Sequence, residues 1–577
     1  MKLTKTRLSL LLIFVLALIL RVIAAFNTHV STDEMFYSII PLNILSADRL
    51  GTVIQSQLYF YLADLGYQLF GGITAISVRL PSIIFGALTV FVIFFISMEL
   101  FKNRKVSLLS SFLFAVSGYA LLYNLETDMP AFFFSLLSML YFIRALHGNY
   151  KNLYLASLFL ALAVMIKTIV VFFIPAYLIV LILYIFKEKK FVNDKEGFRL
   201  DKKLTTSVFW ALVIGILVIS PVFIYNFFLY QETGLTDFYF SSLGFGQNLY
   251  EHLQNKPWDH GTLWSVVKSK SSELIRIDSI IFVFGMLGIL LSWRKNKYVS
   301  LLLISSLLFL VGYIAGVTGS STHFLWVPIV LSIFASYGIF YTGAYIKKKF
   351  KLNYLAPILI IFAILVSSIV MQDILDQREK SITLLMRDYV HNEIPEDAIV
   401  VIDSRIYFGL NAWIFNDRHY VSDRDFMSLV NTPSGQIMGE VIRVPLYYVE
   451  CGPGTNCGWK PEDFANVAPT SEAIANLMKQ QVKKVADVKG IEHFIIYNTS
   501  IEIPSGLFEH IDRNHILWSY PVGWKYPEIA PDNYELEGFL QNKINQFGFL
   551  ILYLDLLITL FAIPLIFYSF LRRKNKV

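Results

Sequence analysis

The chain contains a series of long apolar runs, and these runs restrict its possible folds more than any other feature. A helix needs roughly 20 apolar residues to cross the hydrocarbon core of a bilayer. In lipid, only helices and closed barrels satisfy their own backbone hydrogen bonds. We expect about 12 transmembrane helices, at residues 8–26, 77–101, 106–124, 129–146, 152–166, 169–186, 204–229, 277–293, 298–317, 324–346, 353–371 and 546–571. The predicted class is a polytopic α-helical membrane protein.

Composition agrees with this class and excludes an ordinary soluble domain. Of the 577 residues, 55% are hydrophobic and only 16% are charged, and the mean hydropathy is +0.56. Soluble proteins have a higher fraction of charged residues and a lower fraction of apolar residues. The net charge of +6 does not indicate a nucleic-acid partner, because the bases gather in short loops between apolar runs.

The distribution of these bases predicts the orientation of the chain in the membrane. Alternate loops and both chain ends contain Lys2 to Arg7, Lys102 to Lys105, Lys187 to Lys203, Arg294 to Lys297, Lys347 to Lys351 and Arg572 to Lys576. Basic loops stay in the cytoplasm. We therefore expect a multi-pass protein of the cell membrane with cytoplasmic termini, and external segments at 27–75, 230–276 and 372–545.

Residues 372–545 differ in composition from the rest of the chain. They contain 25 acidic and 15 basic residues, and β-branched runs at 398–403 and 492–497 flank a helical pattern at 471–485. This pattern is typical of a water-facing α/β domain. The predicted organisation is a transmembrane catalytic module (1–371), an extracytoplasmic soluble α/β domain (372–545), and a final transmembrane helix with a basic cytoplasmic tail (546–577).

The two cysteines, Cys451 and Cys457, lie in this external domain. Outside the cell they favour a small disulfide loop over a pair of free thiols. Two sulfur ligands are too few for an ordinary metal site. His252 and His260 are candidates for a divalent metal in segment 230–276, with a structural role as the alternative. We expect no cofactor and leave the metal open.

The residues Gln57 to Phe70 form an apolar stretch that is too short to span a bilayer. We expect it to form an amphipathic helix that lies in the membrane interface. We expect the tyrosine side chains to lie at the level of the lipid headgroups.

Two external segments contain acids at the membrane surface. Asp33 and Glu34 follow the first span directly, and Glu126 and Asp128 lie in a tight turn between two spans. Charges are costly in the membrane, so acids gathered at one face suggest a catalytic site. A carboxylate there could accept a proton from an attacking hydroxyl or amine. The alternatives are solvated loop acids for the first pair and a helix N-cap for Asp128.

Three basic or chargeable residues fall at the same face: Arg79, Lys167 and His323. A phosphate leaving group needs such donors, because negative charge develops on its oxygens as the bond to the sugar breaks. The alternative for each is a side chain that extends to the headgroups without a catalytic purpose. Lys167 is the hardest to explain in that way, since it interrupts an apolar stretch from Leu153 to Ile185.

Together these residues form a pattern that resembles the GT-C glycosyltransferases, with the protein O-mannosyltransferases and the lipid A aminoarabinose transferases as the nearest kin. The resemblance covers residues 1 to about 175. The matching elements are Asp33-Glu34 with Tyr37, Leu58-Tyr59-Phe60-Tyr61-Leu62, Leu69-Phe70-Gly71, Arg79-Leu80-Pro81-Ser82, Phe85-Gly86-Ala87-Leu88, and Thr127-Asp128-Met129-Pro130-Ala131-Phe132-Phe133.

The resemblance implies a function and a set of roles. The donor would be a sugar on a polyprenyl phosphate, the acceptor a protein, lipid or glycan, and the product inverted at the anomeric carbon. The implied catalytic residues are Asp33 as general base, Glu34 as its supporting carboxylate and Asp128 as the second acid. The implied donor-phosphate ligands are Arg79, Lys167 and His323, and the implied substrate contacts are Tyr37, Tyr59 and Glu126.

Two other classes of function remain open from the sequence. A secondary transporter or flippase of lipid-linked sugars would also have many helices, but with charges near the bilayer midplane at a repeat interface. A scaffold for export or adhesion would not need Asp33, Asp128 and Lys167 together. Acids at one surface and a large external domain favour the enzyme.

Overall fold

The computed structural model describes most of the chain. The residues outside the described part are 1–3, 31–33, 35–43, 47–49, 51–56, 124–126, 188–190, 195–196, 238–239, 242–243, 249–261, 294, 318–321, 352–353, 407–412, 416, 431–438, 459–475, 477, 481, 514–537 and 573–577.

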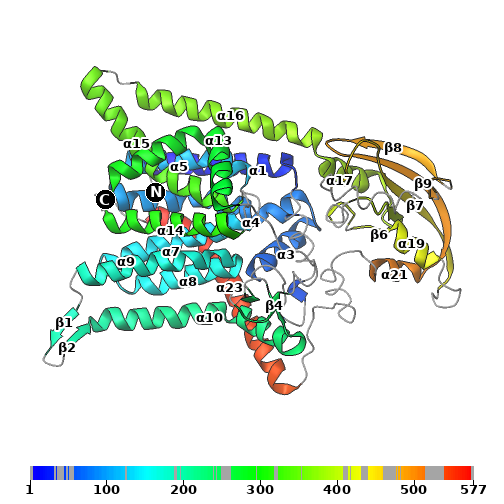
Figure 1. Ribbon diagram of the computed structural model, residues 1–577, viewed down its shortest axis with the longest axis horizontal. Coiled ribbons are helices and arrows are strands. Elements are labelled where there is room, and N and C mark those ends of the chain that lie inside the picture. The colour runs from blue at the N-terminus through cyan, green and yellow to red at the C-terminus, as the bar shows by residue number, and fades with distance from the viewer. Residues whose placement is uncertain are drawn as a thin grey trace.

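The described residues form a helical bundle with a smaller sheet domain at one end (Figure 1). Both termini lie at the opposite end of the bundle. The helices of the bundle are α1 (Lys5–Asn27), α4 (Ala75–Phe101), α5 (Arg104–Ala115), α6 (Gly118–Leu122), α7 (Asp128–Leu146), α8 (Asn152–Ile166), η2 (Thr168–Phe173), α9 (Ile174–Lys187), α10 (Lys202–Thr233), α13 (Leu263–Ser292), α14 (Lys297–Val317), η3 (His323–Leu325), α15 (Trp326–Phe350), α16 (Leu355–Lys380) and α23 (Phe539–Arg572).

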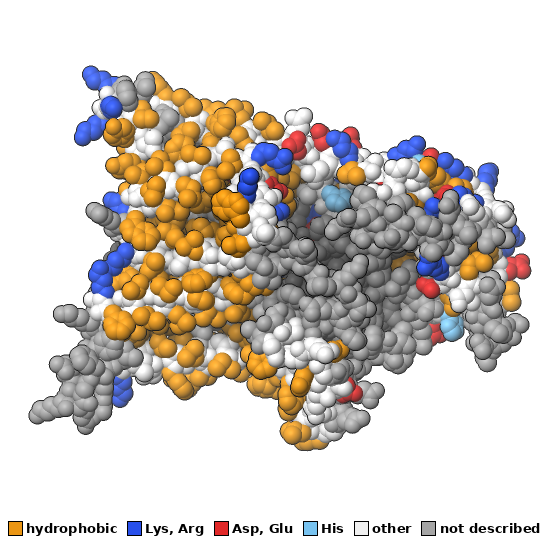
Figure 2. Space-filling model, in the orientation of Figure 1, with side chains coloured by type: hydrophobic (Ala, Val, Ile, Leu, Met, Phe, Trp, Pro, Cys, Tyr) orange, Lys and Arg blue, Asp and Glu red, His pale blue; other side chains and the backbone are white. Residues whose placement is uncertain are grey.

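Nine helices in the described part are long and apolar enough to cross a membrane. On the face shown in Figure 2, apolar side chains cover the bundle, and lysines and arginines lie at its end away from the sheet domain. The protein is therefore a multi-pass membrane protein. The predicted span 106–124 is not one helix: α5 ends at Ala115 and α6 begins at Gly118, because the Ser117 hydroxyl caps α6 by accepting from Ala120 N at 3.1 Å. The predicted count of about 12 remains a prediction.

Close packing between α13 and α15 depends on glycines. A Cβ at Gly288 would lie 1.9 Å from the Phe334 carbonyl oxygen, and one at Gly338 would lie 2.4 Å from the Phe284 carbonyl oxygen. Small residues let helix backbones approach closely in membranes, where van der Waals packing drives association. These two helices form a rigid part of the bundle, and α15 follows directly on the short helix η3 that contains His323.

The helix predicted at the interface is present as α3 (Leu58–Phe70), but its tyrosines do not face the headgroups. Tyr59, Tyr61 and Tyr67 are buried in the protein, and the Tyr59 hydroxyl donates to the Val78 carbonyl at 3.2 Å. The exposed residues are instead Gln68, Leu69 and Phe70 at the end of the helix. The expectation was wrong because α3 packs against α4, and this packing covers side chains that we expected to face the lipid headgroups.

The sheet domain is an α/β structure, as predicted. Its strands are β5 (Ile399–Ile402), β6 (His419–Ser422), β7 (Val441–Cys451), β8 (Lys483–Lys489) and β9 (His493–Pro504), in the order β6-β5-β7-β9-β8. Strand β5 runs parallel to both β6 and β7, whereas β9 is antiparallel to β7 and β8. The helices are α17 (Ile382–Glu393), α19 (Asp423–Val430) and α21 (Leu507–Arg513).

Two details of this domain differ from expectation. The helical pattern at 471–485 is wrong at its end, because Lys483 begins strand β8 and pairs with β9; most of the earlier part lies outside the described residues. Helices α16 and α23 also extend past the predicted domain boundaries, to Lys380 and from Phe539. Cys451 and Cys457 are joined by a disulfide with an S–S distance of 2.01 Å.

Candidate functional site

Asp128, Lys167 and His323 meet at one point in the bundle; we call them the Asp128 cluster. The Asp128 carboxylate accepts from Lys167 Nζ at 2.6 Å through Oδ2 and contacts His323 Nδ1 at 2.8 Å through Oδ1. Asp128 and Lys167 are buried, and the His323 side chain is 13% exposed. Three residues that the sequence predicted separately therefore form one charged group.

Each of these three side chains lies at a position where a helix begins or ends. Asp128 is the first residue of α7, Lys167 lies where α8 ends and η2 begins, and His323 begins η3. Lys167 has an extended backbone, with φ −152° and ψ 117°, which turns its side chain out of the helical path. Asp128 makes the ion pair rather than an N-cap, since the capping position belongs to Thr127.

Three packed aromatic rings hold together the helices that contain the Asp128 cluster. The Trp326 ring lies 5.3 Å from the Phe132 ring and 4.6 Å from the Phe173 ring, so η2, α7 and α15 share one contact. Trp326 Nε1 also donates to the Ser306 hydroxyl on α14 at 3.2 Å. Such packing restricts how far Asp128, Lys167 and His323 can separate.

The Asp128 cluster contains N–H groups that could donate to an anion. A lysine ammonium has three N–H donors, and within the described part of the chain Asp128 is the acceptor that Lys167 Nζ contacts. One carboxylate serves both Lys167 and His323. Buried charges need partners because desolvation is costly. A phosphate oxygen could accept from those donors of Lys167 that no described residue accepts from.

Arg79 and Glu34 form a second buried ion pair. Arg79 Nε donates to Glu34 Oε1 at 2.6 Å and Nη2 donates to Oε2 at 2.8 Å. The same guanidinium donates to the carbonyls of Ala25, Thr28 and His29, at 2.5, 3.2 and 3.2 Å. An arginine has five N–H donors, and these contacts use all five. Arg79 thus holds the end of α1 and Glu34 together.

The two ion pairs lie at a similar depth in the bundle. The Phe85 ring on α4 contacts the Phe133 ring on α7 with 5.1 Å between centroids. Arg79 precedes Phe85 by six residues and Asp128 precedes Phe133 by five. At a rise of about 1.5 Å per residue, both charged groups lie roughly 8 to 9 Å from this contact along their helices.

The remaining predicted residues are placed only in part. Asp33, Tyr37, Glu126, His252 and His260 lie outside the described residues. Tyr59 lies on α3, and its hydroxyl donates a hydrogen bond to the carbonyl of Val78, the residue before Arg79. Among the described residues, no group of three histidine, cysteine, aspartate or glutamate side chains could hold a metal ion.

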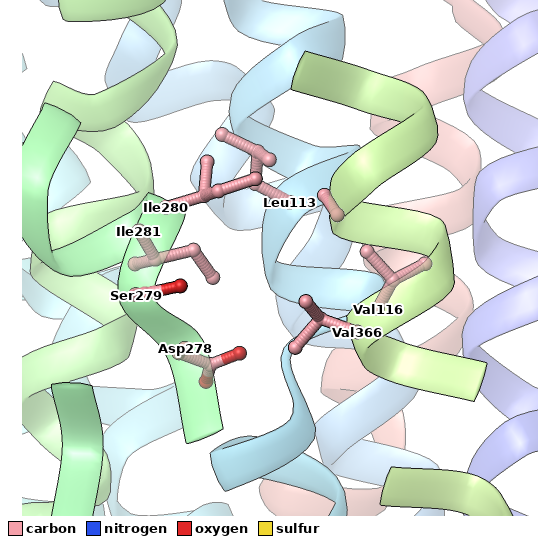
Figure 3. A pocket seen from close by; sticks show the side chains of 8 residues that line it. Leu113, Val116, Asp278, Ser279, Ile280, Ile281 and Val366 are labelled. Atoms are coloured by element: carbon pink, nitrogen blue, oxygen red, sulfur yellow. The ribbon is translucent and has the colours of Figure 1, made fainter. Parts of the chain in front are cut away.

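Asp278 is a structural contributor that the sequence did not indicate. It lies in α13 at a break with φ −128° and ψ 47°, and it lines a small pocket with Leu113, Val116 and Val366 (Figure 3). Its carboxylate accepts from Ser117 Oγ at 2.6 Å and from the amides of Gly118 and Tyr119 at 3.0 Å each. It therefore anchors α6, whose end at Leu122 precedes Asp128 by six residues. An acid inside an apolar helix was the available signal.

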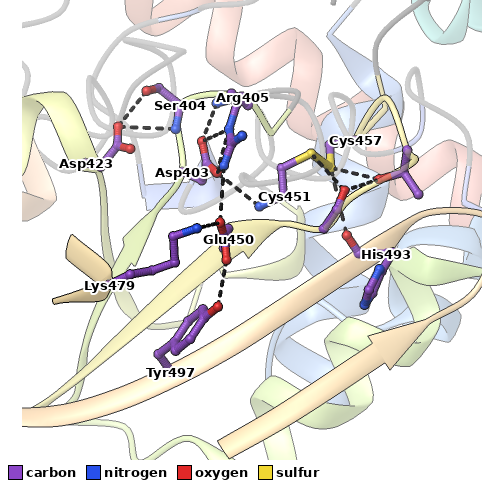
Figure 4. Close-up of polar contacts among 12 residues, drawn as sticks. Asp403, Ser404, Arg405, Asp423, Glu450, Cys451, Cys457, Lys479, His493 and Tyr497 are labelled. Atoms are coloured by element: carbon purple, nitrogen blue, oxygen red, sulfur yellow. Dashed lines mark hydrogen bonds and ion pairs between the residues drawn. A yellow bond between two sulfur atoms is a disulfide. The ribbon is translucent and has the colours of Figure 1, made fainter. Parts of the chain in front are cut away.

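A third charged group lies in the sheet domain (Figure 4). We call Asp403, Arg405, Glu450, Lys479 and Tyr497 the Glu450 cluster. Arg405 Nη2 contacts Asp403 Oδ2 at 2.6 Å and Glu450 Oε1 at 3.5 Å. Lys479 Nζ lies 2.6 Å from Glu450 Oε1, and the Tyr497 hydroxyl donates to Oε2 at 2.8 Å. Here each acid is matched by donors.

Comparison with known proteins places the fold. Residues 55–225 match the model of a family described as dolichyl-phosphate-mannose-protein mannosyltransferase. No curated protein matches the sequence. Among solved structures, apo ArnT from Cupriavidus metallidurans is similar, with a TM-score of 0.55 and 10% identity over 85% of this chain and 97% of that one. ArnT bound to undecaprenyl phosphate gives the same TM-score and coverage with 11% identity.

The chain has the GT-C fold. This confirms the fold that the motifs of the first 175 or so residues predicted. The segment matched by the family model contains Arg79, Asp128 and Lys167, and it ends before His323. The GT-C fold extends the likeness over most of the chain.

Proposed function

We propose that the protein is an integral-membrane inverting glycosyltransferase. It transfers a sugar from a polyprenyl-phosphate donor to a protein, lipid or glycan acceptor at the membrane face that carries the sheet domain. The observation that carries this proposal is the Asp128 cluster, in which one buried carboxylate is shared between Lys167 and His323. The match of residues 55–225 to a family named for a lipid-phosphate sugar donor supports the same chemistry.

In the proposed reaction the acceptor attacks the anomeric carbon directly while the bond from that carbon to the lipid phosphate breaks. Asp33 takes the proton of the acceptor, which makes the attacking atom a better nucleophile. Lys167 and His323 stabilise the negative charge that develops on the departing phosphate. Asp128 holds both of these groups in place, since it contacts each of them. Holding donor and acceptor in line supplies much of the rate.

The geometry changes the role that the resemblance gave to Arg79. Because its five donors are already used by Glu34 and three backbone carbonyls, Arg79 has none left for a phosphate in this arrangement. We assign Arg79 to holding Glu34 and the end of α1. Glu34 then supports the loop that contains Asp33, and the donor phosphate is left to Lys167 and His323.

The test is a transfer assay with the purified full-length protein in liposomes. The protein is given a panel of polyprenyl-phosphate sugars, and release of the bare lipid phosphate is measured together with sugar on the acceptor. We expect one donor of the panel to be cleaved. Movement of the lipid-linked sugar across the bilayer without cleavage would instead establish a flippase.

The Asp33→Asn variant is the matched chemical control for this assay. It removes the proton acceptor while keeping the size and polarity of the side chain. We expect donor binding to remain and transfer to be abolished. Undiminished turnover in this variant would remove Asp33 from the role of base.

A further inference from the structure

The residues that follow α1 are held from two sides. Inside the bundle, Arg79 donates to the carbonyls of Ala25, Thr28 and His29 and pairs with Glu34. On the other side lies the junction where α16 ends at Lys380 and α17 begins at Ile382. This α16–α17 junction joins the bundle to the sheet domain (Figure 1).

Three side chains of the α16–α17 junction contact this segment. The Gln377 side-chain oxygen accepts from the His29 amide at 3.3 Å. Arg378 Nη1 donates to the Phe26 carbonyl at 3.1 Å. The Ser381 hydroxyl lies 2.9 Å from His29 Nδ1. The contacts involve both backbone and side chain of His29, so they fix its position and its orientation.

The junction is itself fixed by the sheet domain. The Ile491 amide, in the turn between β8 and β9, donates to the Lys380 carbonyl at 2.8 Å. Gly490 lies so close that a Cβ there would be 2.5 Å from the same carbonyl oxygen. The Ser381 hydroxyl also hydrogen-bonds the Thr383 hydroxyl at 2.9 Å, and both residues are buried. A displacement of the sheet domain must therefore move the residues that contact His29.

A second contact restricts the docking angle of the sheet domain. Arg387 on α17 donates through Nη2 to the Ile73 carbonyl at 3.0 Å, just before α4 begins at Ala75. The same guanidinium is held by Asp417 at 2.8 and 3.1 Å. The sheet domain is thus attached to the bundle beside both α1 and α4, the two helices that Arg79 connects.

We propose that the α16–α17 junction positions His29 and, through Arg79, the Glu34 carboxylate, so that the sheet domain is part of the catalytic unit. This proposal rests on the proposed function, in which Asp33 is the base. His29 and Glu34 are both fixed, and they are only five residues apart in the sequence. Arg79 Nη2 joins the two, since it donates both to the His29 carbonyl and to Glu34 Oε2. Gln377, Arg378 and Ser381 are positioning residues in this account.

The experiment uses full-length protein with three substitutions in the junction: Gln377→Leu, Arg378→Met and Ser381→Ala. We expect kcat for sugar transfer to fall about tenfold, because small misplacements of a catalytic group cost this much or more. KM for the lipid donor should stay unchanged, since Lys167 and His323 are not touched. Hydrogen exchange at the His29 amide should become faster, because Gln377→Leu removes its acceptor.

Two controls separate positioning from loss of folding. Asp376→Asn with Glu379→Gln changes two exposed residues of the same helix end and should leave kcat and the His29 exchange unchanged. Gln377→Glu and Ser381→Thr keep the oxygen atoms and should restore most of kcat. An unchanged kcat in the triple variant would overturn the proposal, as would a fall that follows a lower unfolding temperature and is not rescued by the conservative pair.

The outcome also separates this proposal from the proposed function. If the unaltered protein transfers no sugar, the proposed function fails, while the exchange measurement still reports on the contact between the junction and His29. If the unaltered protein transfers sugar and the triple variant does so equally well, the positioning role fails and the proposed function stands.

Discussion

The Asp128 cluster and the Glu450 cluster both pair carboxylates with basic side chains, but they differ in the number of carboxylates available to the donors. In the Asp128 cluster, a single carboxylate is shared by an ammonium and an imidazole. In the Glu450 cluster, two carboxylates receive donors from Arg405, Lys479 and Tyr497, and Asp403 Oδ2 also accepts from the Cys451 amide at 3.1 Å. The first has donors to spare for an anion, whereas the acids of the second already have their partners.

This difference separates a binding site from a structural network. The Glu450 cluster lies beside the disulfide loop at the carboxyl ends of β5 and β7, where it ties strands to the following turns. A satisfied network of this kind makes one arrangement of a domain preferable. In the proposed function the Asp128 cluster binds the donor phosphate, so changes in it should affect transfer first. Four predictions test this comparison, in order of decreasing effect.

The largest effect is expected from Asp128→Asn. The change leaves Lys167 and His323 without the carboxylate that positions both, and transfer should fall by about 100-fold or more. The measurement is kcat/KM for sugar transfer in liposomes. Glu450→Gln is the matched control in the sheet domain and should lower the unfolding temperature with little change in kcat. Equal losses of transfer in both variants would end the distinction between the two clusters.

Lys167→Met should act mainly on the lipid donor. A hydrogen bond to a charged group contributes about 1.5 to 3 kcal/mol, so donor affinity should weaken by roughly 10- to 100-fold. Donor binding is measured directly with the polyprenyl phosphate. Lys151→Met, an exposed lysine before the other end of α8, is the control. An unchanged affinity in Lys167→Met would remove the lysine from the phosphate site.

Asp423→Asn should change how the stability of the sheet domain depends on pH. Burial raises the pKa of the Asp423 carboxyl to about 6, against the hydrogen bonds from Ser404. The folded state therefore keeps this proton better than the unfolded state, and stability is lost as pH rises from about 4 to about 6, by at most about 3 kcal/mol.

The asparagine cannot ionise and avoids that loss. The variant should unfold at a higher temperature than the unaltered protein at pH 8, and the advantage should shrink toward pH 4. Thermal unfolding followed across this range is the measurement. An advantage that is independent of pH would show that the carboxyl is not protonated in the folded state.

The smallest effect is expected from Lys479→Met. The Lys479 side chain is 35% exposed, and exposed ion pairs contribute about 0.2 to 1 kcal/mol. Glu450 keeps its contacts with Arg405 and Tyr497, so the domain should lose at most this amount of stability. Lys483→Met is the control at an exposed position on β8. A loss above about 2 kcal/mol would mean that Lys479 is needed for the whole network.

Linear patterns in the sequence were sufficient for the class of fold. Membrane helices satisfy their own backbone, so a run of apolar residues specifies each one locally. The same holds for the separate α/β domain and the motifs that predicted a GT-C fold. Local patterns failed where packing decided the outcome: the tyrosines of α3 are buried against α4 and α23, and Ser117 divides one predicted span into α5 and α6.

The sequence by itself determined which charged residues interrupt or follow the apolar runs, because such runs leave few places for them. Only the tertiary structure decided their partners. Lys167 meets Asp128 across 39 residues, Arg79 meets Glu34 across 45, His323 meets Asp128 across 195, and Ser381 meets His29 across 352. Such pairs depend on where helices end and how they pack. For this reason no local pattern around Arg79 could predict that it contacts both Glu34 and the end of α1.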